Sequence, residues 1–263
     1  MIRMAPLAVL VLSAVQVAPA LDVTTCDTTI PARETGILQT DLSCAGTFVV
    51  TLENRAVLEL NGHSIVTDEV STNAAIRCTG RRCTVRGPGD VSGSDIGIHL
   101  LTGRQVLTVT DVTIHDCESG VVASGVQPSK VLASGLSVTD CAQHGVDAAR
   151  LRGENVTASG NGGVGLAVGH LKAAIVDASN NGTSGVFGSV ARVTSLVATG
   201  NGGAGVRVVR GALRDSTLTG NDALGAGHDL LTARRPRVVN TVCGKSGVLG
   251  GRATATWGVC AND

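Results

Sequence analysis

The sequence predicts an all-β protein that folds as a parallel β-helix, and three observations support this prediction. An asparagine recurs every 20 residues, at Asn161, Asn181, Asn201 and Asn221, and a glycine follows four residues after each one. Apolar residues alternate with hydroxyl residues just before each asparagine. The short period leaves no room for a helix. A fixed repeat of this length indicates a solenoid, in which each coil buries its apolar side chains against its neighbours.

The alternation before each asparagine has the period of two that is typical of a β-strand. Hydroxyl residues such as Thr157, Ser179 and Thr199 occupy the positions predicted to face outward. After the glycine, Val146, Leu166, Val186 and Val206 predict a second short strand, so we expect two strands and two turns in each coil. The predicted inward pairs of the first strand are Val112 and Ile114, Leu136 and Val138, Val156 and Ala158, Val176 and Ala178, and Leu196 and Ala198.

The repeated asparagines predict a structural ladder. Asparagine tolerates the left-handed conformation of a sharp turn, and stacked side-chain amides bond to one another. Glycines are expected to supply positive φ angles beside it. Cys141 and Gly145 hold the same two places one coil earlier, and Cys117 lies 24 residues before Cys141. A phosphate-binding loop is the weaker interpretation of "GNGG", because no helix follows it.

A leucine-rich repeat is the rival fold, because its pattern also places an asparagine or cysteine after alternating leucines. "LSVTDC" (Leu136–Cys141) fits that pattern. The later coils carry alanine where leucine is expected, and Gly163 and Gly203 occupy an apolar site of the motif. These departures favour the β-helix.

The repeats, together with "LELNGHSIV" (Leu58–Val66), resemble the right-handed parallel β-helix proteins of the pectate-lyase-like superfamily. The resemblance covers most of residues 26–260. It implies a right-handed helix and an exported protein of a group whose members often bind, cleave or epimerise acidic polysaccharides, alongside many without chemistry. The chain has no tyrosine for a tyrosine–histidine lyase mechanism and only three aromatic residues, Phe48, Phe187 and Trp257. It also lacks the aspartate-rich signature of polygalacturonase-like relatives and the epimerase motif.

Residues 1–20 have the features of a secretory signal peptide: an early positive charge, an apolar run and an A-x-A cleavage pattern. We therefore expect a secreted protein, extracellular or periplasmic, whose residues 21–263 form one β-helix domain with cysteine-rich caps at both ends. No membrane span is expected after cleavage. Eight cysteines in an exported chain predict four disulfides. Residues close in sequence share a coil or lie in adjacent coils of a solenoid, which predicts the pairs Cys26–Cys44, Cys78–Cys83, Cys117–Cys141 and Cys243–Cys260.

Two clusters of side chains are candidates for function. The first is acidic: Asp116 and Asp140 each precede a ladder cysteine, so we expect them to stack on adjacent coils. His115, Glu118, His144 and Asp147 lie nearby in sequence. Paired carboxylates at this spacing suit acid–base work on a glycosidic bond, with His115 and His144 as further catalytic candidates, or a weak calcium site. A solvated turn built of common turn-forming residues is the alternative.

The second cluster is basic. Arg152, Lys172 and Arg192 share one coil position, 20 residues apart. Vertical columns of cations suit the regularly spaced carboxylates or sulfates of an anionic glycan, and a solvated edge is the alternative. A second column, two residues earlier, holds Arg150, His170 and Arg210.

The charge balance narrows the function further. Lys and Arg number 21, as do Asp and Glu, so the formal net charge is zero and nucleic acid is not an expected partner. We expect a monomeric, secreted β-helix protein that associates with anionic polysaccharide or cell envelope without clear catalytic machinery and needs no cofactor, with Ca²⁺ the possible exception. Two alternatives stay open: a divergent polysaccharide lyase or hydrolase that uses Asp116 and Asp140, and a purely structural or adhesive solenoid.

Overall fold

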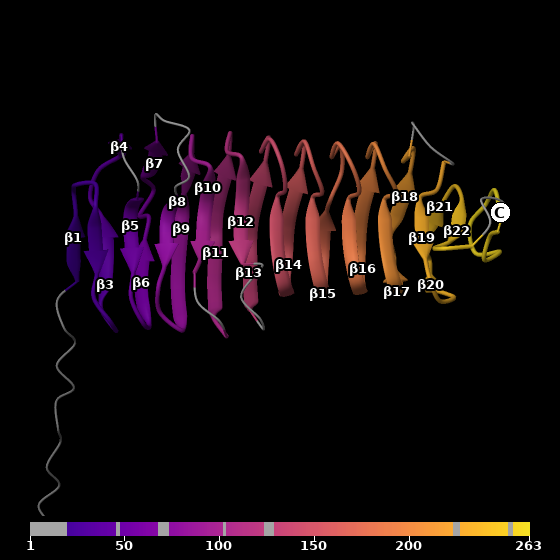
Figure 1. Ribbon diagram of the computed structural model, residues 1–263, viewed down its shortest axis with the longest axis horizontal. Helices are drawn as coiled ribbons and strands as arrows, with labels where there is room; N and C mark the ends of the chain where they lie inside the picture. Colours follow the sequence, from indigo (N-terminus) through magenta and orange to yellow (C-terminus); the bar gives the residue numbers. More distant parts are fainter. Residues whose placement is uncertain are drawn as a thin grey trace, which may run out of the picture.

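The computed structural model describes residues 20–45, 48–67, 74–101, 104–123, 129–222, 227–251 and 255–263. The chain winds into an elongated right-handed parallel β-helix, with the first strands at one end and the C-terminus at the other (Figure 1). Every strand pairing is parallel, and the described residues contain no helix. The predicted fold class is confirmed. The predicted signal peptide lies outside the described residues except for Ala20.

The strand pairings group into three faces that run along the solenoid, and four strands that begin on face 1, called the long strands, continue onto face 2. These long strands are β14 (Val146–Ser159), β15 (Leu166–Asp177), β16 (Val186–Thr199) and β17 (Val206–Arg214). Face 1 contains β2 (Thr28–Ile30), β5 (Phe48–Leu52), β8 (Ala74–Cys78), β10 (Ile96–Leu100), β12 (Ser119–Ala123), the first residues of the four long strands, β19 (Leu230–Thr232) and β22 (Ser246–Val248).

Face 2 follows face 1 along the chain. Four whole strands lie on it: β1 (Leu21–Val23), β3 (Thr35–Leu38), β6 (Ala56–Glu59) and β20 (Arg237–Val239). It also contains the first parts of β9 (Arg82–Ser92), β11 (Val106–His115) and β13 (Lys130–Thr139). The middle of β14 to β16 and the end of β17 complete it. Face 3 contains four whole strands: β4 (Leu42–Cys44), β7 (Ser64–Thr67), β18 (Thr217–Thr219) and β21 (Val242–Cys243). It also contains the last parts of β9, β11, β13, β14, β15 and β16.

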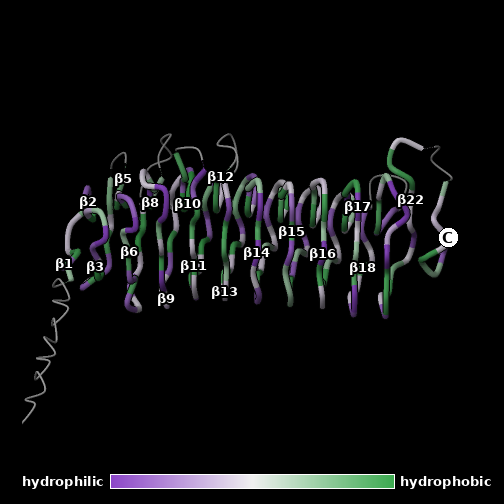
Figure 2. The backbone as a smooth tube through the Cα atoms, turned by 90° about the horizontal axis from the view of Figure 1, so that it is seen from below, coloured by the Kyte–Doolittle hydropathy of each residue, from purple (hydrophilic) through white to green (hydrophobic). Residues whose placement is uncertain are grey.

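The core is the interior of the solenoid. Hydrophilic and hydrophobic residues alternate along the tube (Figure 2), as the period of two requires. Each predicted inward pair is buried, as are Val146, Leu166, Val186 and Val206. One predicted outward hydroxyl is also buried: Ser179, just past the end of β15, accepts a hydrogen bond from the backbone N–H of Thr199 at 3.2 Å.

Each regular coil has three strand segments rather than the two predicted from sequence. The additional segment is the one on face 2, formed by residues 150–154 in β14 and their equivalents. The prediction missed it because charged and small residues dominate its sequence, "RLRGE" in β14, which hides the alternation. This segment carries the basic candidate residues.

The predicted asparagine ladder is present, at the turn between face 3 and face 1. Asn161 donates from Nδ2 to Oδ1 of Asn181 at 3.0 Å, Asn181 does the same to Asn201 at 3.0 Å, and Asn201 to Asn221 at 2.8 Å. All four side chains are buried. Each side chain therefore supplies a partner to the next coil, which stacks the turns in register.

The ladder asparagines do not adopt the left-handed conformation that the sequence predicts for them. The left-handed residue is the one before each ladder asparagine, for example Gly160 (φ 71°) and Asn180 (φ 56°), and not the asparagine itself. Three of the glycines four residues after the asparagines are described, Gly165, Gly185 and Gly205, and none of these three has a positive φ. They are needed for space instead, because a Cβ on Gly165 would lie 2.7 Å from Nδ2 of Asn181.

All four disulfides pair as predicted. Cys26–Cys44 and Cys243–Cys260 close the two ends of the solenoid, with Cα atoms 5.9 and 5.0 Å apart. Cys78–Cys83 spans a short turn, and Cys117–Cys141 joins adjacent coils with Cα atoms 4.5 Å apart. In the part of the chain that the structure describes, no helix is long and apolar enough to cross a membrane.

Candidate binding groove

The basic candidates lie on face 2, and the local sequence determines their orientation. Leu151, Leu171 and Ala191 are buried, so the residue that follows each of them points outward. These following residues are Arg152, Lys172 and Arg192, all exposed.

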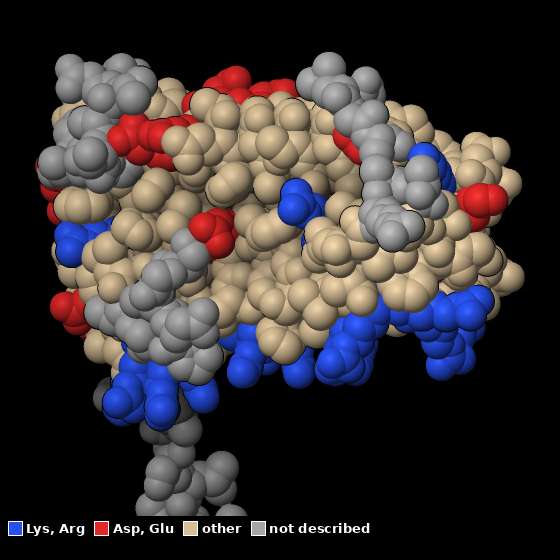
Figure 3. Space-filling view, turned by 45° about the vertical axis from the view of Figure 1, so that its right-hand side comes forward, with Lys and Arg blue, Asp and Glu red and all other residues tan. Residues whose placement is uncertain are grey.

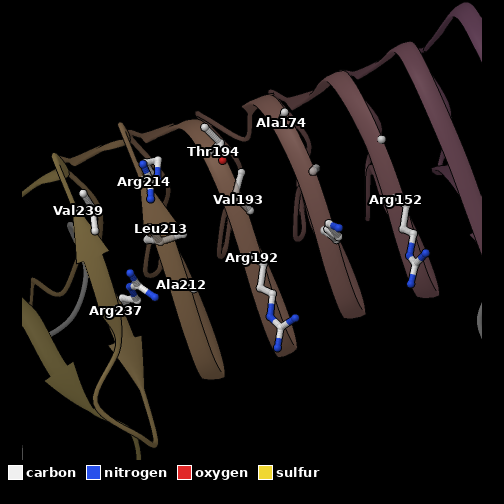
Figure 4. A pocket seen from close by; sticks show the side chains of 13 residues that line it. Arg152, Ala174, Arg192, Val193, Thr194, Ala212, Leu213, Arg214, Arg237 and Val239 are labelled. Carbon is white, nitrogen blue, oxygen red and sulfur yellow. The ribbon is translucent and has the colours of Figure 1, made fainter.

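Strand pairing places the three cations side by side. Arg152 is the register partner of Lys172, and Lys172 is the partner of Arg192. Neighbouring parallel strands are about 4.8 Å apart, so the column carries one positive charge for each coil. In Figure 4 the side chains of Arg152 and Arg192 point in the same direction from their strands.

The column continues beyond the predicted residues. Ala212 follows Arg192 in register, and Arg237 follows Ala212, so a cation returns in the next coil. Arg214, two residues after Ala212, is the register partner of Thr194 and adds a further cation. In the sequence Arg237 stands out only as part of a basic run and Arg214 does not stand out at all, because neither lies at the 20-residue spacing of the column.

These side chains border a shallow cavity of about 550 Å³ on face 2 (Figure 4). Small residues, Gly153, Ala173, Ala174 and Ala212, leave the space between the cations open. A second cavity of about 380 Å³ adjoins it and shares Arg152, Gly153 and Ala174. We call the two together the basic groove. It runs along the solenoid axis from the coil of Thr108 to that of Arg237.

The charge of the basic groove is unequal along its length. The half toward the C-terminus has five cations: Arg152, Lys172, Arg192, Arg214 and Arg237. The half toward the N-terminus has hydroxyl residues such as Thr108 and Ser134, and one carboxylate, Glu154. Figure 3 shows Lys and Arg gathered along the lower edge of the solenoid and acidic residues mostly along the upper edge. The chain is neutral overall, but on the face shown in Figure 3 most of its cations and most of its carboxylates lie at opposite edges.

The second predicted column flanks the basic groove. Arg150 pairs in register with His170, His170 with Val190, and Val190 with Arg210, so an uncharged residue interrupts the column. Arg150, His170 and Arg210 are exposed and line neither cavity of the groove. Arg150 and Arg210 extend its positive edge.

The structure brings the acidic candidates together only in part. Register aligns Asp116 with Asp140, since their preceding residues His115 and Thr139 are partners. Both aspartates adopt left-handed φ angles, 50° and 55°, which is a structural reason for aspartate at these turns. Among the described residues, no three His, Cys, Asp or Glu side chains lie close enough together to share a metal ion.

The two histidine candidates have separate partners. Nδ1 of His115 lies 2.8 Å from Oδ2 of Asp116. Nδ1 of His144 accepts the backbone N–H of Val164 at 3.0 Å, so this imidazole holds the turn of the next coil in place. His144 thus has a structural task in addition to any role at a site.

The aromatic side chains with ring contacts lie away from the basic groove. The Arg77 guanidinium carbon lies 4.3 Å from the centre of the Phe48 ring, and that of Arg207 lies 5.7 Å from the centre of the Phe187 ring. Both pairs are on face 1. Recognition in the groove would therefore depend on charge and hydrogen bonds rather than on ring stacking.

The fold defines the class: the chain is a right-handed parallel β-helix protein. Among solved structures it is similar to the mannuronan C-5 epimerase A-module of Azotobacter vinelandii, with a TM-score of 0.54, 13% sequence identity, and coverage of 81% of this chain and 80% of that one. At this identity the similarity shows the fold alone. No protein-family model and no curated protein sequence matches the chain.

Proposed function

We propose that this protein is exported and binds a linear anionic polysaccharide along the basic groove. The observation that carries the proposal is the register of Arg152, Lys172 and Arg192, which repeats one positive charge per coil on a strand face. A polymer that lies along the solenoid axis would meet these cations one after another. Four disulfides are consistent with an oxidising compartment outside the cytoplasm.

The composition of the groove supports anion binding. Five cations border its C-terminal half, and alanine and glycine leave room for a chain of sugar rings between them. Each exposed ion pair contributes about 0.5–1 kcal/mol, so five together supply about 2.5–5 kcal/mol, which corresponds to a Kd between about 0.2 and 15 mM. Because exposed charges are screened, binding should weaken as the salt concentration rises. The structurally similar protein is a mannuronan epimerase module by name, which supports the view that this fold can present a surface to an acidic polysaccharide.

We propose binding rather than turnover. Glu154 is the one carboxylate among the residues lining the described groove, and no histidine or tyrosine accompanies it there. Acid–base cleavage of a glycosidic bond uses a pair of carboxylates that flank the bond. The aspartates of the enzymatic alternative, Asp116 and Asp140, line neither cavity of the groove.

The test is binding of polygalacturonate and alginate by affinity electrophoresis at low ionic strength. The variant Arg152→Ala/Lys172→Ala/Arg192→Ala should bind about 10- to 100-fold more weakly, because it loses about 1.5–3 kcal/mol. A matched pair of single variants provides the control. Arg192→Ala on face 2 should weaken binding, whereas Arg207→Ala removes the same charge from face 1 and should not. Equal binding by wild type and the triple variant would refute the proposal.

A further inference from the structure

Two adjoining cavities lie at the turn between face 3 and face 1, in the coils that precede the asparagine ladder. Their volumes are about 400 and 340 Å³, and both are lined by Asp95, Glu118 and Gln143. We call these two cavities the acidic cleft. It shares no lining residue with the basic groove, so a ligand of the cleft would be independent of the proposed function.

The wall of the acidic cleft contains buried polar atoms without partners. Asp95 is 8% exposed, and its Oδ1 has no hydrogen-bond partner among the described residues. Its neighbour Ser94 is 4% exposed, and its Oγ also has no hydrogen-bond partner among the described residues. A buried polar atom without a partner costs about 1–3 kcal/mol. Both atoms have almost no exposed surface, so a hydrogen-bond donor in the cleft would offset this cost by drawing the Asp95 carboxylate toward it.

The solenoid does not require the side chains of Glu118 and Gln143. Backbone hydrogen bonds place Ser94, Glu118 and Gln143 at the same turn in successive coils, and the next coils carry Gly163 and Thr183 there. The turn therefore also forms with glycine at the position of Glu118 and Gln143. The side-chain amide of Gln143 donates to Oε1 of Glu118, which holds that carboxylate at the cleft.

The charge and the spread of the cleft point to one kind of ligand. The described residues that line it include four carboxylates and no lysine or arginine. They are distributed over adjacent coils and do not converge, since no three acidic or histidine side chains of the described chain can share a metal ion. Separated carboxylates match separated cationic groups better than a single ion. The four carboxylates are those of Asp95, Asp116, Glu118 and Asp147.

We propose that the acidic cleft binds a linear polyamine. Primary ammonium groups, each with three N–H donors, would bond to the carboxylates of Asp95 and Glu118. The methylene segments between them would lie against Ile96, Val122 and Ala142, which line the same cavities. The Cys117–Cys141 disulfide beneath the cleft holds the two coils together.

The test is titration of the full chain with spermidine by isothermal calorimetry at low ionic strength. Spermidine should bind the wild-type protein, and Asp95→Asn/Glu118→Gln should bind it at least tenfold more weakly. Asp90→Asn/Glu53→Gln removes the same charge at exposed positions outside both the cleft and the basic groove and should bind like the wild type. Circular dichroism establishes that each variant is folded, and the exposed single variant Glu118→Gln provides the test if Asp95→Asn impairs folding.

Three outcomes would overturn the proposal. The first is no binding of spermidine to the wild type, and the second is equal weakening by the control pair, which would show only a general charge effect. The third is stoichiometric binding of CaCl₂ or of the neutral oligosaccharide maltotetraose that depends on Asp95 and Glu118 while spermidine binding does not. In each case loss of polygalacturonate binding by the groove variant can still be measured separately.

Discussion

Oδ1 of Asp229 accepts two hydrogen bonds from Asn221, one from the side-chain Nδ2 at 2.7 Å and one from the backbone N–H at 3.1 Å. An aspartate thus takes the place that the next asparagine of the ladder would hold. Its other oxygen, Oδ2, accepts the backbone N–H groups of Gly244 at 2.7 Å and Lys245 at 3.3 Å. Asp229 ends the ladder and connects it to the last coil.

Replacing Asp229 should therefore destabilise the C-terminal half of the solenoid. Asp229→Ala removes the acceptor of the backbone N–H groups of Asn221 and Gly244 and of one N–H of the Asn221 side chain, which keeps its other bond to the Ala198 carbonyl. We expect a loss of about 2–4 kcal/mol in the free energy of unfolding. Asp229→Asn keeps one acceptor oxygen and should lose about half as much. Urea denaturation followed by circular dichroism measures both. Asp90→Asn, at an exposed position of β9, should change stability by less than about 0.5 kcal/mol.

Two adjacent asparagines should respond differently to substitution. Asn181 is a ladder residue whose Nδ2 donates to Asn201 and to the carbonyl of Ala158, so Asn181→Ala should cost about 2–4 kcal/mol. Asn180 has a left-handed backbone with φ of 56°. Asn180→Gly should be nearly neutral, because Gly160 and Gly200 occupy this place in the coils on either side. Similar losses for Asn181→Ala and Asn180→Gly in a thermal melt would contradict this division of roles.

The C-terminal cap should loosen in acid. Burial alone would raise the pKa of Asp263, but hydrogen bonds from the Ser246 hydroxyl and from the backbone N–H groups of Cys260, Ser246 and Val259 outweigh it and lower the pKa below 3.8. A carboxyl whose folded pKa is depressed stabilises the fold above its unfolded pKa and loses this contribution as pH falls through the folded pKa. Amide hydrogen exchange at Ser246 and Cys260 should therefore accelerate below about pH 3.8, relative to the intrinsic rate. Asp263→Asn should show fast exchange at these amides already at neutral pH.

The 20-residue period was sufficient to predict the regular part of the fold. Each coil repeats the same contacts with its neighbours, so Asn161 to Asn221, the inward residues and the disulfides could be predicted from position alone. The end of the ladder could not, because Asp229 follows Asn221 by eight residues rather than 20. The left-handed turn was assigned one residue too late, since a ladder residue and its neighbour cannot be distinguished by spacing.

In the candidate sites, too, the residues that follow the 20-residue period could be predicted from the sequence and the others could not. The column of Arg152, Lys172 and Arg192 follows the period and could be predicted, whereas the cations that complete the basic groove depart from it. Arg237 returns to the column after an alanine and a longer coil. Asp95 was missed because it lies in a coil without a ladder asparagine, where the sequence offers no register for alignment. Only the structure shows that it meets Glu118 at one cleft.

The central claim is that an anionic polysaccharide lies along face 2, and mapping the bound chain by NMR tests it most directly. A ¹⁵N-labelled protein is titrated with an oligogalacturonate at low ionic strength. We predict that the backbone amide shifts concentrate at Arg152, Lys172 and Arg192 and at the small residues between them, and that they disappear at high salt. Shifts centred on Phe187 and Arg207 of face 1, or no shifts at all, would contradict the claim.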